Sequence, residues 1–413
     1  MRKRVVITGA GAVSPLGNTL PETWEALAAG KSGAAPITSF DASKLKTHFA
    51  AEVKGFDASQ FLGTREARRL DRFAQFAMVS TLEAVEQSRL HVTDDNRDRI
   101  GVLIGSGIGG VHTLYEQLEI FNERGPDRVS PFLVPMMISD SAAGNVAIRL
   151  GMRGPNMALA TACATGSNAI GEAGEMIRRG AADVMVAGAS EAAIVPVAMA
   201  GLNAMTALST RNDDPQSASR PFDKNRDGFL IAEGGAVVVL ESLEYAQARG
   251  AKILCELTGY GTSDDAFHIS APAENGAGAA ISIQLALTNA GLKPVDISYI
   301  NAHGTSTQLN DKSETVAIKS VFGETAYKVP ISSTKSMTGH LMGASGSLEA
   351  SICVEIFMHD ILPATINYET PDPLCDLDYI PNHSRKAHPK HIMSNSFGFG
   401  GHNATLIFSR YEE

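Results

Sequence analysis

The sequence is poor in cysteine, in aromatic residues and in charge. Its four cysteines are scattered, with no Cys-x-x-Cys pair, so the pattern indicates neither a zinc site nor a disulfide framework. No segment approaches the roughly 18 uninterrupted apolar residues that a membrane-spanning helix needs. The short, charged start of the sequence leads straight into an apolar strand, without the apolar region and cleavage site of a signal peptide. We therefore expect a cytoplasmic protein in a reducing compartment.

The charge that is present excludes another class of function. The formal net charge is −10, which argues against a general nucleic-acid binder. Glycine, in contrast, is abundant, with 39 residues in a chain of 413, and 44% of the residues are hydrophobic. A chain of this length and composition can bury a large core. The glycines suit the tight turns and close backbone contacts of a layered α/β protein.

Strands and helices are predicted to alternate in the same order twice. In the first half we expect strands at 4–9, 99–105, 157–161, 183–188 and 235–241, with helices at 64–89, at 138–149 and after Cys163. In the second half we expect strands at 252–262, 297–302, 329–334, 392–396 and 404–409, with helices at 277–290, 311–322 and 345–358. This alternation favours mostly parallel sheets with helices on both faces. We predict two duplicated halves, residues 1–250 and 251–413.

Cys163 stands where the periodicity of the sequence changes. The residues before it read as a short buried strand, whereas apolar residues recur at helical spacing from Ala169 to Ile177. A thiol at such a junction faces the positive end of the helix dipole, which favours the thiolate. The alternative is a small buried core residue, which is the usual place of a cysteine. The junction favours a nucleophile.

Two histidines, His303 and His340, lie in glycine-rich turns of the second half. Cys163 follows the third predicted strand of the first half, and His340 follows the third strand of the second. A pseudo-twofold packing of the halves would therefore bring these two residues together. One thiol and two histidines favour covalent thioester chemistry, with two structural histidines as the alternative.

Seven ordered motifs resemble those of a known enzyme family over essentially the whole chain. The matching segments are Val6–Gly9 with Ser14–Gly17, Ile104–Gly110, Thr161–Cys163, Ser219–Asp223 with Arg226–Phe229, Asn301–Thr307, Ser333–His340 and Asn395–Gly401. The sequence resembles the β-ketoacyl-acyl carrier protein synthases of the elongating, decarboxylating type, and among them the form called synthase II.

The resemblance implies a fold and a reaction. The fold is the thiolase fold, a five-layer αβαβα arrangement, and the enzyme is expected to be a homodimer. The reaction is acyl transfer to Cys163, followed by decarboxylative Claisen condensation with malonyl carrier protein. His303 and His340 are expected to bind the malonyl thioester carbonyl and to assist the loss of CO2. Negative charge develops on a thioester oxygen at each step and needs donors, which the resemblance assigns to the backbone N–H groups of Cys163 and Phe399.

Polar support for this site also comes from the resemblance. Lys335 carries over as a residue that tunes the charge near the site, and Glu349 as its ion-pair partner, because an uncompensated buried charge is destabilising by several kcal/mol. A surface ion pair is the alternative. We expect no catalytic metal and no cofactor, since the substrates carry phosphopantetheine on their acyl carrier protein. The resemblance adds one structural monovalent cation near Asn301, Glu349, Ser394 and Asn395.

Substrate contacts carry over in the same way. The ring of Phe399, within a flexible glycine loop, is expected to gate access to the thiol. Thr305 and Thr307 match hydroxyls that bind the phosphopantetheine arm. Ile108 matches a position that lines the acyl pocket and helps to set chain length.

A row of arginines indicates a binding partner independently of the family resemblance. The residues recur at i, i+3, i+4 and i+7 and predict one cationic stripe on the helix at 64–89: Arg65, Arg68, Arg69 and Arg72. In an acidic chain this patch suits docking of an acidic protein such as acyl carrier protein, and Arg128 and Arg211 extend it. The alternative is a solvated helix face that pairs internally with Glu66 and Asp71.

Other functions fit the sequence less well. The glycines at 9 and 11 imitate a dinucleotide-binding loop but lack the third small residue and a suitably placed acid, and Ser345 lacks the G-x-S-x-G pattern of a serine hydrolase. A degradative thiolase would need a second catalytic cysteine near its C-terminus, a role that neither Cys353 nor Cys375 suits. A polyketide ketosynthase subunit remains the nearest enzymatic alternative. A non-catalytic scaffold of the same fold is the alternative from another class.

Overall fold

Ten strands form the main sheet of the computed structural model, which describes residues 3–273 and 275–412. One half has the order β5-β4-β6-β7-β1, with bounds Asn156–Met157, Ile100–Gly105, Val184–Glu191, Gly234–Ser242 and Val5–Val13. The other half has the order β10-β9-β13-β14-β8, with bounds Ile331–Ser332, Tyr299–Asn301, His391–Phe397, His402–Ser409 and Cys255–Asp264. Pairing of β1 with β8 joins the two halves into one sheet.

The two halves repeat the same strand directions. In the first, β4 is parallel to β5 and β6, and β7 is antiparallel to β6 and β1. In the second, β9 is parallel to β10 and β13, and β14 is antiparallel to β13 and β8. The predicted duplication is thus visible in strand order as well as in strand direction.

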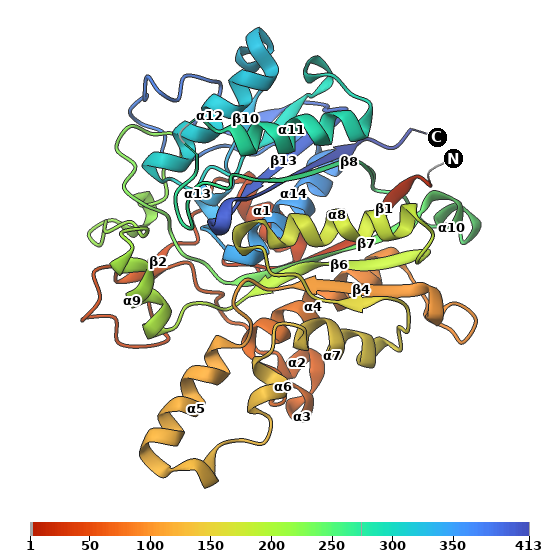
Figure 1. The fold of residues 1–413 in the computed structure, drawn as a ribbon, viewed down its shortest axis with the longest axis vertical. Coiled ribbons are helices and arrows are strands. Elements are labelled where there is room, and N and C mark those ends of the chain that lie inside the picture. Colours follow the sequence, from red (N-terminus) through yellow and green to blue (C-terminus); the bar gives the residue numbers. More distant parts are fainter. Residues whose placement is uncertain (1–2, 274, 413) are drawn as a thin grey trace.

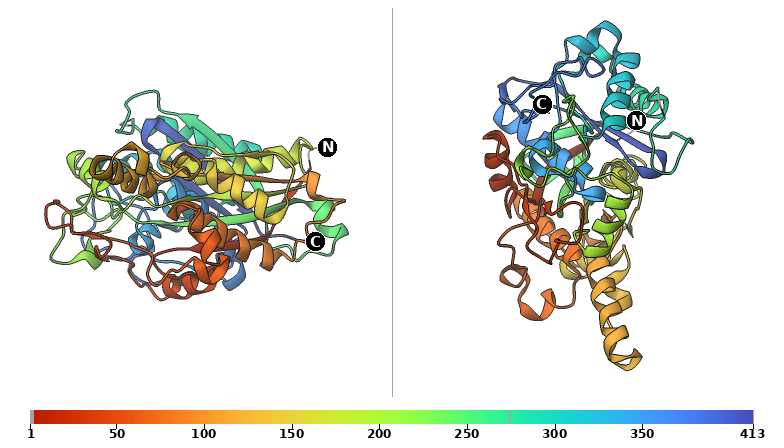
Figure 2. Two further views of the ribbon diagram at one scale, coloured as in Figure 1. Left: turned by 90° about the horizontal axis from the view of Figure 1, so that it is seen from below. Right: turned by 90° about the vertical axis from the view of Figure 1, so that its left-hand side faces the viewer.

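Helices stack on these strands in layers, as Figures 1 and 2 show. On one outer face, α4 (Arg72–Ser88) packs on β1 and β7, and α7 (Ser141–Leu150) packs on β4. On the other, α11 (Ala277–Ala290) packs on β8 and β14 beside α12 (Gln308–Phe322). Between the halves lie α8 (Thr165–Arg178) and α14 (Ser345–His359), which contact each other and strands of both halves. The result is the predicted five-layer αβαβα arrangement.

The two central helices approach each other at a pair of glycines. A Cβ atom on Gly166 would lie 2.5 Å from the backbone nitrogen of Ser347, and a Cβ on Gly346 would lie 2.8 Å from the backbone nitrogen of Ser167. Such distances leave no room for a side chain at either position. The first turns of α8 and α14 therefore touch backbone to backbone.

The remaining elements lie around this framework. The helices are α1 (Leu20–Ala28), α2 (Ser59–Leu62), α3 (Thr64–Ala67), α5 (Val111–Arg124), α6 (Leu133–Met137), α9 (Pro196–Ala204), α10 (Leu243–Ala248) and α13 (Lys335–Thr338). The short strands are β2 (Ala35–Pro36) paired with β3 (Phe49–Ala50), and β11 (Ile361–Leu362) paired with β12 (Arg385–Lys386). Helix α5 projects from the body, at the bottom of Figure 1.

Three predicted elements differ from the structure. The strand expected at 329–334 is only the two residues of β10. The helix expected at 64–89 is two helices, α3 and α4, because the side chain of Asp71 accepts a hydrogen bond from the N–H of Phe73 and begins α4 anew. The strand expected at 157–161 is only the two residues of β5, since the chain then turns and the backbone N–H of Thr161 donates to Thr165 Oγ1. Within the described part of the chain, no helix combines the length and apolar character needed to cross a bilayer.

Candidate active site

Cys163 lies in a tight turn that leads into α8. Ala162, just before it, has a φ of 47°, in the left-handed region, and a single 3₁₀ turn over Ala162–Ala164 follows. The thiol is buried, with 4% of the residue exposed. Sγ of Cys163 and one ring nitrogen each of His303 and His340 all lie within 4.8 Å of one another. The structure thus brings together the three residues on which the thioester hypothesis rests.

The electrostatics of the thiol differ from the sequence-based expectation. Burial, and to a smaller extent the charge of Glu191, raise the pKa of Cys163 to about 11, whereas the N–H of Phe399, the charge of Lys335 and its own N–H act to lower it. Burial outweighs these contributions, so the resting group is a thiol and not the thiolate that the helix start was expected to favour. The N–H groups of Cys163 and Phe399 face the sulfur and are available to negative charge that develops there.

The two histidine rings lie close together and nearly perpendicular. Their centroids are 5.5 Å apart at an interplanar angle of 86°. Burial, and next the charge of Lys335, lower the pKa of both imidazoles well below the usual value, so both rings are neutral at neutral pH. His340 Nδ1 lies 2.7 Å from Ser345 Oγ, and the ring of Phe229 packs edge-on against His340 at 5.2 Å.

A buried carboxylate that the sequence pattern does not single out holds the His303 loop. Glu314, on α12, accepts hydrogen bonds from the backbone N–H groups of His303 and Gly304, at 2.9 and 2.8 Å. Burial raises the pKa of Glu314 to about 7, although these N–H donors lower it. Glu314 shares one face of α12 with Asp311 and Thr315, which are also buried. This spacing is the sequence signal that could have predicted a carboxylate pointing into the protein.

Lys335 and Glu349 form an ion pair beside the histidines. Lys335 Nζ contacts Glu349 Oε1 and donates to the backbone carbonyl of His303 at 2.8 Å. Both side chains are almost fully buried, with exposed fractions of 2% and 3%. Burial raises the pKa of Glu349 to about 7, against the lowering effect of Lys335. The lysine therefore ties α13 and α14 to the loop that carries His303.

Behind this ion pair lies a group of buried polar atoms without hydrogen-bond partners. Among the described residues these atoms include both amide atoms of Asn301, Ser394 Oγ and Glu349 Oε2. Asn395, the fourth residue of the expected cation site, is already bonded, because its amide donates to Glu314 and accepts from Thr405. Oxygen-rich orphaned groups of this kind fit a bound hard cation.

A cavity of about 350 Å³ opens onto the reactive trio. Its lining includes the expected phosphopantetheine contacts Thr305 and Thr307, whose hydroxyl oxygens are 3.0 Å apart, and the expected gate Phe399. Ile108 does not line this cavity, and its side chain is 43% exposed on the surface. The structure therefore gathers the thiol, the imidazoles and the two threonines, but it leaves the expected acyl-pocket residue outside.

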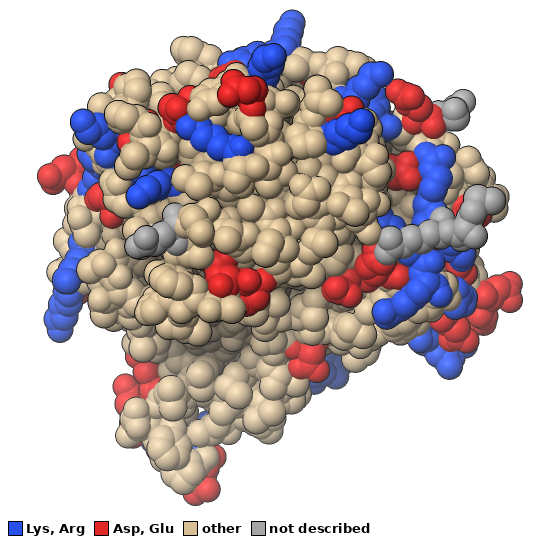
Figure 3. Space-filling model, turned by 45° about the horizontal axis from the view of Figure 1, so that its top comes forward, with Lys and Arg blue, Asp and Glu red and all other residues tan. Residues whose placement is uncertain are grey.

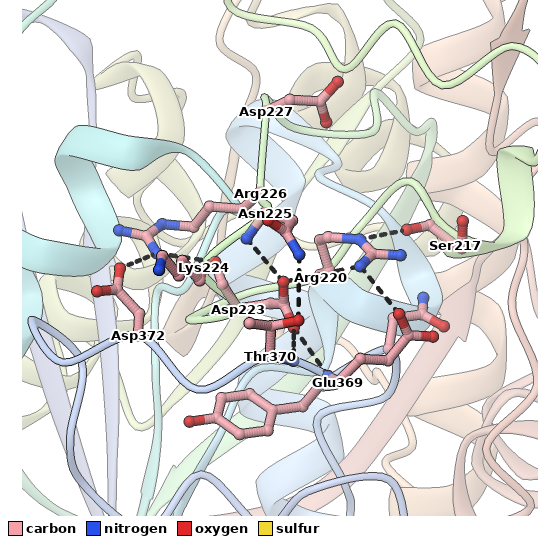
Figure 4. A network of polar contacts seen from close by, with 12 residues as sticks. Ser217, Arg220, Asp223, Lys224, Asn225, Arg226, Asp227, Glu369, Thr370 and Asp372 are labelled. Atoms are coloured by element: carbon pink, nitrogen blue, oxygen red, sulfur yellow. Dashed lines mark hydrogen bonds and ion pairs between the residues drawn. The ribbon is translucent and has the colours of Figure 1, made fainter.

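A polar network around Arg226 supports the threonine loop, and Figure 4 shows the part of it that joins Arg226 to Asp372. The buried Arg226 donates to the backbone carbonyls of Thr307 and Gln308 and pairs with Asp372 at 2.6 Å. It also lies 3.6 Å from Asp311, on α12. This network fixes the segment that ends in Phe229, and so the ring that packs against His340.

The arginine stripe is not a single helix face, which corrects the sequence-based prediction. Arg65 lies on α3 and Arg68 caps it, both exposed, whereas Arg69 stacks its guanidinium over the ring of Phe132 at 5.4 Å. Arg72 begins α4 and pairs with Glu233 at 2.6 Å. The internal partners considered for the stripe are engaged elsewhere, since Glu66 pairs with Arg149 and Asp71 caps α4.

The reactive trio is also the one group of three metal-ligating side chains found in the described residues. Thiolate and imidazole are typical zinc ligands, but this set fits a metal poorly. His303 Nδ1 has no hydrogen-bond partner among the described residues. Metal-ligating histidines ordinarily donate their second ring N–H to an orienting acceptor. The arrangement suits a nucleophile with two neutral hydrogen-bond donors.

Comparison with known proteins agrees with this chemistry. The family description "Beta-ketoacyl synthase, N-terminal domain" matches residues 2–246, and "Beta-ketoacyl synthase, C-terminal domain" matches residues 254–369. The 3-oxoacyl-[acyl-carrier-protein] synthase 2 of Synechocystis sp. is 53% identical over 411 residues, which cover 100% of this chain and 99% of the relative.

Solved structures of the same fold superpose closely. The ishigamide ketosynthase/chain length factor has a TM-score of 0.93 at 36% identity, with 100% of both chains covered. A type II PKS ketosynthase, solved with its acyl-carrier protein and bound to the hexaketide, has a TM-score of 0.92 at 35% identity, again with 100% of both chains covered. The predicted thiolase fold is thereby confirmed, and the chain belongs to the β-ketoacyl synthase family of condensing enzymes.

Proposed function

We propose that this β-ketoacyl synthase elongates the acyl chains of fatty acid synthesis. It condenses an acyl group with a malonyl group, both supplied as thioesters of acyl carrier protein, and releases CO2. The observation that carries the proposal is the meeting of one buried thiol and two neutral imidazoles in a single cavity. The name of the relative at 53% identity supports assignment to the synthase 2 type.

In the first half-reaction, Cys163 takes the acyl group. Its Sγ attacks the thioester carbonyl carbon, the new C–S bond forms, and the phosphopantetheine sulfur leaves with the thiol proton. The tetrahedral oxyanion accepts hydrogen bonds from the N–H groups of Cys163 and Phe399, which both face the sulfur. Donors fixed in advance at the developing charge are the largest single source of such catalysis.

In the second half-reaction, His303 and His340 act on the malonyl group. Both imidazoles are neutral, and each donates an N–H to the malonyl thioester oxygen. Loss of CO2 breaks the carbon–carbon bond and leaves an enolate, whose negative oxygen these donors stabilise. The enolate carbon then attacks the acyl carbon on Cys163, and Sγ leaves as a thiolate that takes a proton from water. The lowered pKa values of the two histidines support this donor role.

The buried charges and the orphaned polar atoms act as support. Burial, and next the charge of Lys335, keep both imidazoles neutral by lowering their pKa values, and Glu349 compensates the charge of Lys335 in the interior. A structural monovalent cation held by Asn301, Glu349 and Ser394, with Asn395 beside them, supplies the partners that their buried atoms lack. Bound there, the cation would link β9 and β13 to α14.

The substrates reach Cys163 through the cavity. Thr305 and Thr307 hydrogen-bond the phosphopantetheine arm, and the ring of Phe399 opens and closes the path to the thiol. Glycines on both sides of Phe399 allow this movement, and Gly400 has a φ of 85°, a conformation that favours glycine. Ile108, on the exposed loop after β4, lies outside this cavity and meets the acyl chain only where that chain extends beyond it.

The carrier protein docks on the arginines near α3. Arg65, Arg68 and Arg69 remain for this role, with Arg128 and Arg211 as extensions, whereas Arg72 is engaged with Glu233. Acyl carrier protein is acidic, so a cationic surface in a chain of net charge −10 favours its approach. The solved complex of a related ketosynthase with its acyl-carrier protein supports a partner of this class.

A second copy of the chain covers the projecting face around α5. Exposed apolar side chains gather on α5, α6, α7 and β5 and the segments between them: Leu118, Phe121, Phe132, Val134, Ile138, Ile148 and Met157. Strand β5 is an edge strand, and uncharged residues cover much of the lower projection visible in Figure 3. Exposed patches and open strand edges of this kind mark interfaces. We therefore propose that the protein is a homodimer. We also propose that its two halves divide between residues 250 and 251 and that it is located in the cytoplasm.

A polyketide ketosynthase subunit is the second candidate, because one solved neighbour at 35% identity is a type II PKS ketosynthase. The test is a series of saturated acyl carrier proteins, from hexanoyl to palmitoyl, with malonyl carrier protein as the extender. A single condensation on each saturated chain is expected. Repeated condensation without reduction, giving poly-β-ketone products, would favour the second candidate, and no condensation with any chain would refute both.

A further inference from the structure

The turn that carries Cys163 has a counterpart in the second half of the chain. Met342 has a φ of 48°, matching the 47° of Ala162, and a 3₁₀ turn over Met342–Ala344 leads into α14 as the turn at Cys163 leads into α8. Gly343 thus occupies in the second turn the position of Cys163 in the first. The reciprocal contact of α8 and α14 at their glycines agrees with this pseudo-twofold relation.

The backbone donors of the two turns face different partners. At the first turn, the N–H of Cys163 faces the cavity together with that of Phe399, which follows β13. At the second turn, the N–H of Gly343 donates to Glu191 Oε2 at 3.0 Å. Glu191 is the last residue of β6, the strand that corresponds to β13 in the other half. A carboxylate of the protein itself therefore fills the second turn's anion-binding position.

Glu191 is held by dipoles. Besides Gly343, three donors bind it: the hydroxyl of Ser106 at 2.8 Å, the N–H of Gly107 at 2.8 Å and the N–H of Ile108 at 3.2 Å. No cation forms an ion pair with this side chain in residues 3–273 and 275–412. Burial raises the pKa of Glu191 to about 6, and the four donors act against that rise. The group is fully buried.

These contacts join two segments that the proposed function uses. One is the loop after β4, which carries Ile108, and the other is the turn after His340. The fit is tight on both sides, because a Cβ on Gly107 or on Gly343 would lie 2.8 Å from Glu191 Oε2. A shift of either segment would break at least one hydrogen bond to the carboxylate. Glu191 thus fixes the distance between the acyl-binding loop and the histidine turn.

We propose that Glu191 is a positioning residue for the condensation, which sets the Ile108 loop against the His340 turn so that the acyl chain and the malonyl group meet correctly at Cys163. The inference rests on the proposed function, since it assumes an acyl chain beside Ile108 and a malonyl group at His340. Glu191 acts through the backbone of both segments and touches no reacting atom. Its loss should therefore change how substrates align more than whether the thiol reacts.

The variant Glu191→Gln keeps the size of the side chain but replaces one acceptor oxygen with an N–H₂ group, which faces two of the four donors. The matched control is Glu52→Gln. Glu52 is also buried and accepts three hydrogen bonds, from the N–H and hydroxyl of Thr38 and the N–H of Ser39, away from the cavity that holds Cys163. Both variants lose comparable hydrogen bonds, so a merely structural role predicts similar behaviour.

Three measurements on the full-length enzyme separate the outcomes: alkylation of Cys163 by iodoacetamide, self-acylation from hexanoyl to palmitoyl carrier protein, and condensation with malonyl carrier protein. For Glu191→Gln we expect condensation to fall by about tenfold or more and the preferred acyl length to shift, with alkylation within about threefold of wild type. For Glu52→Gln we expect an unchanged length profile. Equal profiles for both variants would overturn the inference, even if both unfold at lower temperature.

If Glu191→Gln does not fold, Ser106→Ala replaces it, because that change removes one donor to Glu191 and leaves the carboxylate in place. It should shift the length profile in the same direction by a smaller amount, and an unshifted profile would refute the inference. Failure of the proposed function looks different. In that case the wild-type enzyme itself would not condense acyl and malonyl carrier proteins.

Discussion

In the first half of the chain the turn before the central helix presents the thiol of Cys163, whereas the equivalent turn in the second half presents Gly343, without a side chain. The backbone follows the same path in both turns. In the first, the N–H donors are open to a cavity, and in the second they are closed by Glu191. The comparison teaches that the duplicated fold provides two similar anion-binding turns. The chemistry depends on which of them is left open.

The sharpest way to break this comparison is to remove the thiol. Cys163→Ala makes the first turn chemically as inert as the second, so self-acylation should fall by at least about 10⁴-fold, because no other residue in the cavity offers a thiol. Intact mass measurement after incubation with acyl carrier protein checks this. Thermal unfolding should stay near that of wild type, which serves as the control. A covalent acyl adduct on the variant would contradict the role of Cys163.

The second half contributes the histidines, and their removal should affect the other half-reaction. His303→Ala and His340→Ala should each slow malonyl decarboxylation by about 100-fold, since each loses one donor to the enolate oxygen. Self-acylation of Cys163 should change by less than about fivefold. Separate assays of CO2 release and of acylation provide the readout. Equal losses in both assays would show that the two halves do not divide the chemistry in this way.

The protonation state of Cys163 can be measured from the pH dependence of its alkylation. The pKa of Cys163 is raised to about 11, so the thiolate fraction grows about tenfold per pH unit anywhere below that value. The rate of alkylation by iodoacetamide should rise accordingly from pH 7 to pH 9. The two histidines stay neutral over this range, because their pKa values are lowered, and should add no inflection. A plateau below pH 9 would mean that the helix start does stabilise the thiolate.

The closed turn is tested by filling its space. Gly343→Ala should lower the free energy of unfolding by about 1–3 kcal/mol, the usual range for overpacking, because the new Cβ would lie 2.6 Å from the backbone nitrogen of Gly107. The control is Gly201→Ala on α9, where a Cβ meets no atom within 4 Å and alanine should stabilise by about 0.5–1 kcal/mol. Urea unfolding of both variants gives the difference. Two similar values would refute the tight fit around Glu191.

The smallest effect is expected at the surface, far from either turn. Reversing Arg65, Arg68 and Arg69 to Glu should raise KM for carrier-bound substrates by about three- to tenfold at low salt, through lost electrostatic attraction. A small acyl thioester should react at the wild-type rate. The control reverses three exposed lysines of the second half: Lys328, Lys386 and Lys390. A similar rise in KM for that control would indicate a general charge effect instead of a docking surface.

The sequence predicted the family, the enzyme class and the layered fold, and all three are confirmed by the comparisons. The layered fold was readable because the alternation of strands and helices is a local pattern, whereas the family and the enzyme class came from the resemblance of the seven motifs. The break between α3 and α4 was missed, since Asp71 reads as one more polar residue on a helix until its cap to Phe73 is seen. The pairing of Arg72 with Glu233, 161 positions away, is equally invisible in a local pattern.

Buried carboxylates were the largest omission in the site. Glu191 and Glu314 carry the charge that usually marks a surface position, and only the folded chain shows the backbone donors that hold them inside. The raised pKa of Cys163 was missed for a related reason. The helix start is readable from the sequence, but the depth of burial that outweighs it depends on packing against the loop of Phe399.

The contact of α8 and α14 at Gly166 and Gly346 has a mechanical consequence. Each glycine lies three residues beyond the centre of its turn, so the two helices touch each other close to their N-terminal ends. A side chain at either glycine would push the two helices apart and move Cys163 away from the turn that follows His340. The absence of a side chain at Gly166 and at Gly346 therefore sets the distance between Cys163 and the turn that follows His340. This distance does not depend on a bond between the reacting residues.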